Sequence, residues 1–308
     1  MLQTTIKQRA YCEGVGLHSG KTVSLTLRPA VENTGIVFHV STEKGTRVIT
    51  ASPEAVIATS LATTLGCDGA TVSTVEHLLA ALRGLEIDNV HIDVSGGEIP
   101  ILDGSAAAFV DLLNEAGIMT QFKKRKVLRF AEPVTFTQGE KSIKAEPYKG
   151  FRVEYTIDFR HPAIGRQHRT LELTPASFAQ VAKARTFGFL KDVEALQAHG
   201  LALGGSLDNA VVLDENGVIN PDGLRYVDEF VRHKILDFVG DMAMLPLPLQ
   251  GRFTVTCSGH ALNNEFLRHC MKTSALRVEE ASPETRAAKP QKERRTVGSP
   301  LGMPAFAG

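Results

Sequence analysis

The sequence predicts an α+β fold built from two halves that share one plan. Three observations lead to this prediction. Segments in which apolar and polar residues alternate occupy much of both halves, helical patterns interrupt them at corresponding places, and each half has several strands, a helix, one more strand and a final helix. Two such halves would each bury one face of a sheet under their helices, so we expect two similar α/β sandwich domains.

The first half opens with strands. In the segment KTVSLTLRP, Val23, Leu25 and Leu27 alternate with polar residues, which is the period of a strand with one buried face. The segments TGIVFHVS and GTRVITAS have a similar pattern. A helix is then expected over residues 73–84, followed by the strand IDNVHIDVS and by a second helix for which Gly117 is the stop signal. We assign residues 1–122 to the first domain.

Four consecutive basic residues, 123–126, separate the halves, and we interpret them as a linker between domains. Beyond them, strands are expected in VLRFAEPVTFTQG, KSIKAEPY, FRVEYTIDF and RFTVTCSG, and helices in PASFAQVAKA, in DEFVRHKILDFVGDM and over residues 261–271. We assign residues 127–275 to the second domain. Residues 276–308 are rich in charged residues, Pro and Gly and lack periodicity, so we expect a disordered tail.

The composition excludes several classes of protein. Lys and Arg number 34, as do Asp and Glu, which leaves no electrostatic basis for binding nucleic acid. No apolar run is long enough for a transmembrane helix, and the first residues do not form a signal peptide, so we expect a cytoplasmic protein. Nothing demands more than a monomer. The four cysteines are scattered without a Cys-x-x-Cys pair, which argues against a cysteine-based zinc site and against a disulfide framework.

The segment VRHKILDFVGD carries a histidine and two aspartates at steps of four. On a helix, His233, Asp237 and Asp241 would share one face, and an imidazole with a carboxylate at this spacing forms half of a site for a divalent cation. The alternative is a buried histidine that hydrogen-bonds an aspartate for structural reasons, which is the commoner role of an isolated pair of this kind.

The segment STVEHLLAAL supplies a second histidine. His77 with His233 and Asp237 would give two histidines and one carboxylate, the ligand count of a catalytic zinc with one open position. The adjacent Glu76 would lie beside the metal, where hydrolysis needs a general base. Alternatively, residues 73–76 form a capping box that closes the start of the helix. The two interpretations are compatible.

Three further positions could contribute to a site. His260 lies at a strand-to-helix junction and, if Asp241 keeps it cationic, could protonate a leaving group; alternatively it is an ordinary residue of a helix start. Thr186, in KARTFGF, could donate a hydrogen bond to an oxyanion, or belong to a loop with buried aromatic residues such as Phe187. The segment EGVGLHSG lacks the Lys-Ser/Thr of a phosphate-binding loop, and we expect a turn between strands with His18 as a cleft residue.

Five segments together resemble one family of enzymes: STVEHLLAAL, GGEIPILDGSAAAFV, ARTFGF, HKILDFVGD and SGHALNN. With these segments in the family's order, residues 4–274 resemble the UDP-3-O-acyl-N-acetylglucosamine deacetylases, zinc amidases of lipid A biosynthesis in Gram-negative bacteria. The resemblance implies two α+β sandwich domains packed face to face, with a metal site at their junction. It implies hydrolysis of the N-acetyl group of UDP-3-O-(3-hydroxyacyl)-N-acetylglucosamine with release of acetate. It also implies one zinc ion per chain, or iron in its place, and a nucleotide-sugar lipid as substrate.

Catalytic roles follow from the same resemblance. It implies His77, His233 and Asp237 as metal ligands, and Glu76 as the general base. The other catalytic positions that it implies are His260 as general acid, Asp241 as the partner of this histidine, Thr186 near the scissile carbonyl, and Lys234, which contacts the substrate's phosphate or polarises the site.

Substrate contacts are implied farther from the metal. In TIDFRHP, Asp158 and Phe159 match positions associated with the uridine, and we add Phe187 and His18 as substrate contacts. Residues 189–212 correspond to an insert that forms a passage for the acyl chain, which agrees with their apolar content. The expected passage residues are Leu190, Leu196, Leu201, Leu203 and Val211.

Two alternatives stay open at the level of sequence. One is a metal hydrolase that acts on a different amide. The other is a binding module without catalysis, stabilised by a metal with a closed coordination shell. Three protein ligands beside Glu76 favour an open shell, and therefore an enzyme.

Overall fold

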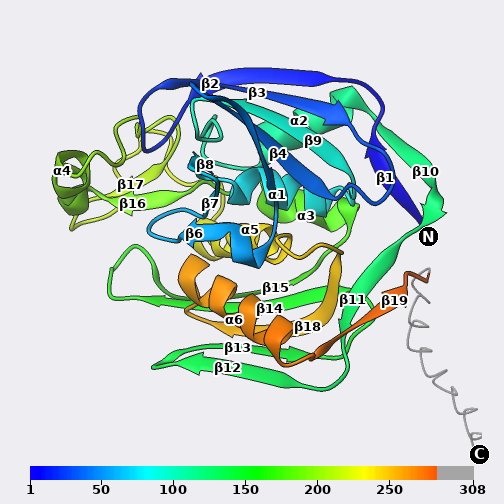
Figure 1. The fold of residues 1–308 in the computed structure, drawn as a ribbon. Helices are drawn as coiled ribbons and strands as arrows, with labels where there is room; N and C mark the ends of the chain where they lie inside the picture. The colour runs from blue at the N-terminus through cyan, green and yellow to red at the C-terminus, as the bar shows by residue number, and fades with distance from the viewer. Residues whose placement is uncertain (283–308) are drawn as a thin grey trace, which may run out of the picture.

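The computed structural model describes residues 1–282 and has two large sheets with helices between them (Figure 1). The first sheet, blue to cyan in Figure 1, has five strands in the order β2-β3-β9-β4-β5. Its strands are β2 (Ala10–Val15), β3 (Thr22–Pro29), β4 (Ile36–Thr42), β5 (Gly45–Thr50) and β9 (Val90–Ser95). Strand β9 runs parallel to β4, and the other neighbours are antiparallel.

The second sheet repeats this order and these directions in β12-β13-β18-β14-β15, where β18 is parallel to β14 and the other neighbours are antiparallel. Two more strands, β11 and β19, extend it to seven. Its strands are β11 (Lys126–Phe130), β12 (Val134–Gln138), β13 (Lys141–Glu146), β14 (Phe151–Phe159), β15 (Gly165–Glu172), β18 (Leu249–Thr256) and β19 (Leu276–Glu280).

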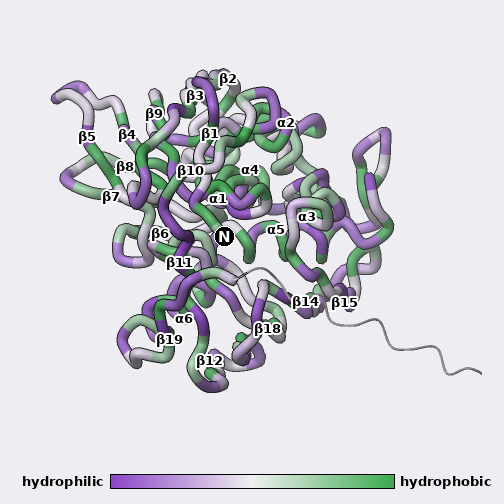
Figure 2. Tube along the Cα trace, turned by 90° about the vertical axis from the view of Figure 1, so that its right-hand side faces the viewer, coloured by the Kyte–Doolittle hydropathy of each residue, from purple (hydrophilic) through white to green (hydrophobic). Residues whose placement is uncertain are grey.

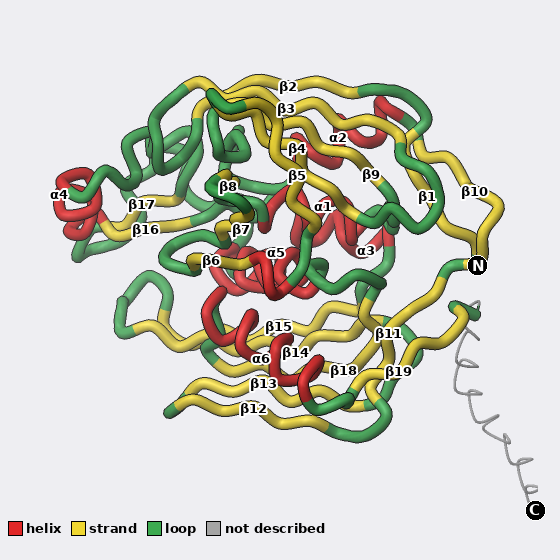
Figure 3. The backbone as a smooth tube through the Cα atoms, in the orientation of Figure 1, coloured by secondary structure: helices red, strands yellow, loops and turns green. Residues whose placement is uncertain are grey.

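The helices follow the same repeat. Helix α1 (Glu76–Gly84) precedes β9 and α2 (Ala107–Ala116) follows it, whereas α5 (Glu229–Met242) precedes β18 and α6 (His260–Lys272) follows it. Helices α1 and α5, with α3 (Pro175–Ala182), form the layer between the two sheets (Figure 3). The shared plan that the sequence predicted is therefore present in the order and direction of the elements.

Smaller elements fill the edges of the molecule. The sequence patterns did not distinguish these elements. Strand β1 (Leu2–Ile6) pairs with β10 (Ile118–Lys124), and a small sheet contains β6 (Val56–Ala58), β7 (Thr64–Cys67) and β8 (Ala70–Val72), preceded by a 3₁₀ helix at Pro53–Ala55. Strands β16 (Phe187–Phe189) and β17 (Val211–Leu213) form a parallel pair, and helix α4 (Leu190–Ala198) follows β16. Helix α4 and this strand pair form a lobe at one side of the molecule, at the left in Figure 1.

The core forms where the alternating patterns predicted it. Val23, Leu25 and Leu27 are fully buried on one face of β3, and the apolar residues of β9 are buried beside them. Hydrophobic stretches gather around α1 in the interior, whereas many of the outer turns are hydrophilic (Figure 2). Helix α2 ends as expected before Gly117, which has a φ of +69°.

Two boundaries differ from the sequence prediction. The basic residues 123–126 are not a free linker, because β10 and β11 run through them and the buried Arg125 guanidinium lies 2.8 Å from the Asp88 carboxylate. The tail expected from residue 276 begins instead with β19, which pairs antiparallel with β11. The rest of the predicted tail, residues 283–308, lies outside the described residues. Among residues 1–282, no helix is long and apolar enough to cross a membrane, and the four cysteines are free thiols.

The two middle helices approach each other most closely at Gly240. A Cβ atom at this position would collide with the carbonyl oxygen of Glu76 and would lie 2.8 Å from its carbonyl carbon. Only a residue without a side chain allows α5 to lie against the first turn of α1 at this distance.

Gly240→Ala is expected to force the helices apart and to lower the free energy of unfolding by about 1–3 kcal/mol, the usual cost of overpacking. Alanine otherwise favours a helix over glycine, so a loss of stability would report the collision itself. Urea denaturation measures the change. Gly217→Ala, where an added Cβ meets nothing within 4 Å, is the control and should leave stability unchanged. A Gly240→Ala variant as stable as the wild type would contradict the close approach.

Candidate active site

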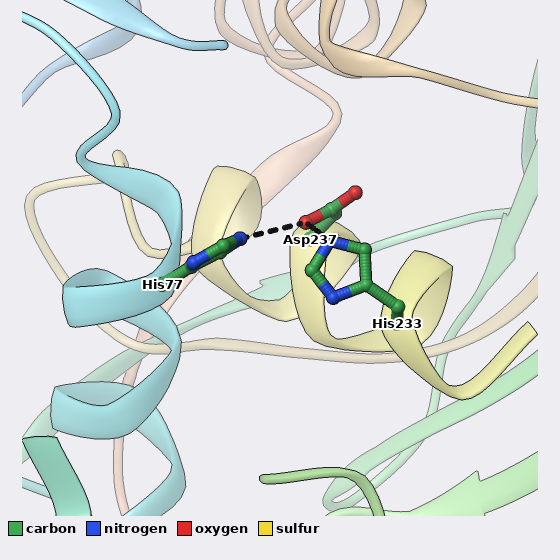
Figure 4. A group of neighbouring side chains, drawn as sticks. All are labelled: His77, His233 and Asp237. Atoms are coloured by element: carbon green, nitrogen blue, oxygen red, sulfur yellow. Dashed lines mark ion pairs between the residues drawn. The ribbon is translucent and has the colours of Figure 1, made fainter. Parts of the chain in front are cut away.

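Three side chains from the two middle helices point toward one another: His77 from α1, and His233 and Asp237 from α5 (Figure 4). One ligand atom of each lies within 4.8 Å of the others. Asp237 Oδ1 lies 3.2 Å from His233 Nε2 and 3.7 Å from His77 Nε2. The two imidazole rings are almost perpendicular, at 85°. Because one helix comes from each half of the chain, the cluster exists only where the halves pack together.

The protonation states of this cluster fit a divalent cation. Burial lowers the pKa of His77 to about 3 and also lowers that of His233, so both imidazoles are neutral. Burial alone would raise the pKa of Asp237, but His233 and Lys234 outweigh this effect and hold it well below its usual range. Neutral imidazoles with an ionised carboxylate are the states in which these groups bind metal.

Unsatisfied atoms point to the same conclusion. Asp237 Oδ1 is buried and has no hydrogen-bond partner among the described residues, although it faces both imidazoles. Leaving a buried carboxylate oxygen unpaired is costly, so a purely structural His–Asp contact does not account for the arrangement. A cation held by the three side chains would satisfy this oxygen and both Nε2 atoms.

Neighbouring groups orient the α5 ligands. His233 Nδ1 lies 3.0 Å from the carbonyl oxygen of Ala184, which directs Nε2 toward the cluster. Lys234 Nζ donates to Asp237 Oδ2 at 2.8 Å, so that Oδ1 is left for the cation. The other nitrogen of His77, Nδ1, has no partner within residues 1–282.

Glu76 is the first residue of α1 and lies next to this cluster. The capping box considered from the sequence does not form, because Val75 is the N-cap and makes no side-chain bond. Instead, Glu76 Oε2 accepts a hydrogen bond from the backbone of Thr63 at 3.1 Å. Burial raises the pKa of Glu76 to about 7, which suits a group that accepts a proton near neutral pH.

His260, at the start of α6, faces Glu76 from the other side. Its Nδ1 lies 2.8 Å from Asp241 Oδ2, and its Nε2 lies 3.8 Å from Glu76 Oε1. Burial opposes the charged form of His260, but Asp241 outweighs it and raises the pKa to about 9. The site thus holds a cationic imidazole opposite a carboxyl group, two groups whose environments suit opposite proton-transfer roles.

Two supporting residues were missed from the sequence. Thr63 donates its backbone N–H to Glu76 and its hydroxyl to Asp241 Oδ1 at 2.8 Å, and so links the two carboxyl groups. Asn263 donates to Asp241 Oδ2 at 2.7 Å. Asn263 could have been found, because it follows His260 at helical spacing in SGHALNN. No helical or strand spacing pointed to Thr63, because it lies outside any regular element.

A cavity of about 640 Å³ joins the cluster of His77, His233 and Asp237 to the α4 lobe. Around the cluster it is lined by all three candidate ligands together with Glu76, Lys234 and His260. Of the other predicted positions, it is lined by His18, Phe159, Thr186, Phe187, Leu190 and Leu196. The apolar lining also includes Val212, which belongs to the predicted passage segment 189–212, and Leu61 and Ile219, which the sequence did not predict.

Five predicted positions lie outside the lining of this cavity. One is Asp241, which contacts His260 instead, and the other four are predicted substrate and passage residues. Val211 is fully buried in the core, and its neighbour Val212 lines the cavity instead, because successive residues of β17 face opposite sides. Leu203 is half exposed, and Leu201 is also absent from the lining. The roles predicted for these three residues in the acyl passage stay predictions. Asp158 is exposed on β14, opposite Arg166, while the adjacent Phe159 faces the cavity.

Comparison with known proteins gives one consistent result. The family model of the UDP-3-O-acyl N-acetylglycosamine deacetylases matches residues 3–272. A protein called UDP-3-O-acyl-N-acetylglucosamine deacetylase from Nitratidesulfovibrio vulgaris is 63% identical over 279 residues, which cover 91% of each chain. The protein of the same name from Oleidesulfovibrio alaskensis is 59% identical over the whole of both chains. The one from Haemophilus influenzae is 51% identical over 270 residues, which cover 86% of this chain and 88% of the relative.

Removing one ligand should abolish metal binding. Purified wild-type protein is expected to carry one equivalent of divalent metal, and His233→Ala should carry little, because two ligands hold a cation far less tightly than three. Elemental analysis measures the content. Added Zn²⁺ should raise the melting temperature of the metal-free wild type but not that of the variant. His269→Ala is the control. This histidine is on α6, where its ring contacts Phe136 of β12, and its removal should leave the metal content unchanged. Unchanged metal content in His233→Ala would exclude the cluster as the site.

Proposed function

The chain belongs to the UDP-3-O-acyl-N-acetylglucosamine deacetylase family, and we propose on this basis that it hydrolyses the N-acetyl group of UDP-3-O-(3-hydroxyacyl)-N-acetylglucosamine in lipid A biosynthesis. The products are acetate and a free amine on the sugar. The observation that carries the proposal is the buried cluster of His77, His233 and Asp237, which opens into a cavity with an apolar far side.

We propose that residues 1–122 and 127–275 are two α/β sandwich domains, packed face to face with the metal site at their junction. The repeated strand order supports this division, as does the position of the ligands on one middle helix from each half. The cytoplasmic location and the monomeric state expected from the sequence stay predictions.

His77, His233 and Asp237 would hold one zinc ion, with iron as the alternative metal. Two imidazoles and one carboxylate are a ligand set of catalytic zinc sites. When bound, the ion supplies Lewis-acid chemistry, which polarises the amide carbonyl and makes water a better nucleophile.

Glu76 acts as the general base in this proposal. As water attacks the acetamide carbonyl carbon, the Glu76 carboxylate takes its proton. The raised pKa of Glu76 matches that task at neutral pH, and the Thr63 N–H holds the second carboxylate oxygen in place. The oxygen of the former carbonyl gains negative charge, which the Thr186 hydroxyl and the Lys234 ammonium on the cavity wall would stabilise.

His260 acts as the general acid. Its Nε2–H would protonate the sugar nitrogen as the carbon–nitrogen bond breaks, which turns a poor leaving group into a neutral amine. Asp241 keeps the imidazole cationic through the contact at Nδ1, and Asn263 and Thr63 hold Asp241. Both proton transfers can therefore serve the same amide, because Glu76 Oε1 and His260 Nε2 lie 3.8 Å apart.

The rest of the cavity would bind the substrate. Leu190 and Leu196 on α4 would contact the acyl chain, whereas Phe159, with Asp158 beside it, lies where the uridine is proposed. His18 and Phe187 line the same space. Acyl contacts far from the reacting amide hold the amide in place, so a substrate without the acyl chain should react poorly.

A deacetylation assay tests the proposed function. Purified protein should release acetate from the acylated UDP-N-acetylglucosamine and act far more slowly on the sugar that lacks the acyl chain. A chelator should abolish the activity, and added Zn²⁺ should restore it. Equal activity on both sugars would favour a hydrolase of a different amide. Bound zinc without any hydrolysis would favour a binding module.

Glu76→Gln separates catalysis from metal binding. Glutamine preserves the shape of the side chain but cannot accept a proton, so turnover should fall by about 100-fold or more while the zinc content is unchanged. Steady-state kinetics and elemental analysis measure the two quantities. Glu265→Gln, on the exposed face of α6, is the matched control and should behave like the wild type. Near-normal turnover in Glu76→Gln would rule out its role as base.

A further inference from the structure

We propose that the buried ion pair of Glu229 and Arg185 positions the candidate metal site, by fixing the segment of residues 184–186 against helix α5. Neither residue is a candidate metal ligand, and neither is among the residues that line the cavity. Both act through the residues beside them, which makes them positioning residues. The inference rests on the proposed function, which places a metal ion in this site.

The contacts of Glu229 use both carboxylate oxygens. Glu229 is the first residue of α5, and its side chain is fully buried. Oε1 accepts from Arg185 Nε at 2.9 Å and from the Arg185 backbone N–H at 3.0 Å. Oε2 accepts from Arg185 Nη2 at 3.2 Å and from the Arg225 backbone N–H at 2.6 Å. The pair is therefore held in one orientation rather than as a mobile surface contact.

Helical spacing connects this pair to the metal ligand. Glu229 and His233 are four residues apart, so they lie one above the other on the same face of α5. Glu229 binds Arg185, and His233 Nδ1 contacts the carbonyl oxygen of Ala184. Two successive residues of the segment are thus held by two successive turns of one helix. The Ala184 carbonyl, which orients His233, cannot shift without breaking contacts to Glu229.

The same segment carries Thr186 to the cavity wall. The Thr186 N–H donates to the carbonyl oxygen of Gly104 at 2.8 Å, and its own carbonyl accepts from Val211 at 2.8 Å. Arg225, whose backbone binds Glu229, also reaches Asp103 with its guanidinium at 2.8 Å. Residues 103–104 belong to the first half of the chain, so the segment joins that half to the helix that bears His233 and Asp237.

Stability alone does not explain a charged pair at this place. Removing two charges from water costs several kcal/mol, and well-packed apolar side chains of similar size often stabilise a fold as well or better. A charged pair with fixed geometry offers directionality that apolar side chains lack. That property matters here because a ligand imidazole must present one particular nitrogen to the metal.

The test compares Glu229→Gln with Asp228→Asn. Glutamine keeps the size of the side chain but directs an NH₂ group at donors of Arg185 or Arg225. The zinc dissociation constant, measured by competition with a chromogenic chelator, is expected to rise about 10–100-fold in Glu229→Gln, as it does when groups that orient metal ligands are removed. In zinc-saturated protein, kcat should fall while KM changes little.

Asp228→Asn is the matched control. Asp228 precedes Glu229 and pairs instead with Arg169 at 2.8 Å and Arg232 at 2.5 Å. Its substitution removes the same charge from the same end of α5, so it controls for the interaction of that charge with the helix dipole. The zinc affinity of Asp228→Asn should match that of the wild type, even if its thermal stability falls.

Arg185→Lys provides a second variant in case Glu229→Gln does not fold. Lysine keeps the buried charge but loses the two parallel bonds of the guanidinium, so a several-fold weaker zinc affinity is expected. Wild-type zinc affinity in folded Glu229→Gln, or in Arg185→Lys where the former does not fold, would overturn the proposal. A wild-type protein that binds no zinc would instead refute the proposed metal site. Wild-type protein that binds zinc but lacks deacetylase activity would refute the proposed function and leave this comparison intact.

Discussion

The close packing of helix α1 against helix α5 is the contact on which the candidate site depends. His77 comes from one helix, His233 and Asp237 from the other, and the glycine at position 240 lets the α5 backbone lie against the carbonyl of Glu76. A side chain at that crossing would separate a ligand and the proposed base from the remaining ligands. The repeated sheets above and below serve the same contact, because each carries one of the two helices on its inner face.

Burial gives the groups at this contact their chemistry. In water, a glutamate such as Glu76 loses its proton well below neutral pH, and a histidine such as His260 is largely uncharged at pH 7. In the site, burial raises the pKa of the first and the Asp241 charge raises that of the second. Thr63, Asn263 and the carbonyl of Ala184 pair several of the polar atoms that surround them. Asp237 Oδ1 is buried without a hydrogen-bond partner among the described residues, and it is the atom that a cation would satisfy.

Local patterns predicted much of the fold and the shared helix face of three site residues. Alternation located the strands that bury Val23, Leu25 and Leu27, and helical spacing placed His233, Asp237 and Asp241 on one face. The structure differs from these patterns where local signals were ambiguous. Val211, predicted for the acyl passage, is buried in the core, and the segment from residue 276, predicted as a tail, begins with β19, which pairs with β11. In both cases a partner distant in sequence decides the outcome.

The sequence by itself determined which residues have the chemistry for a metal-dependent hydrolase and on which elements they lie, because side-chain type and helical or strand period are local properties. Only the tertiary structure decided that His77 meets His233, that Thr63 joins Glu76 to Asp241, and that Glu229 and His233 together hold residues 184–185. These contacts join residues between 13 and 178 positions apart. Their geometry follows from how two sheets and their helices pack, and no local pattern encodes that packing.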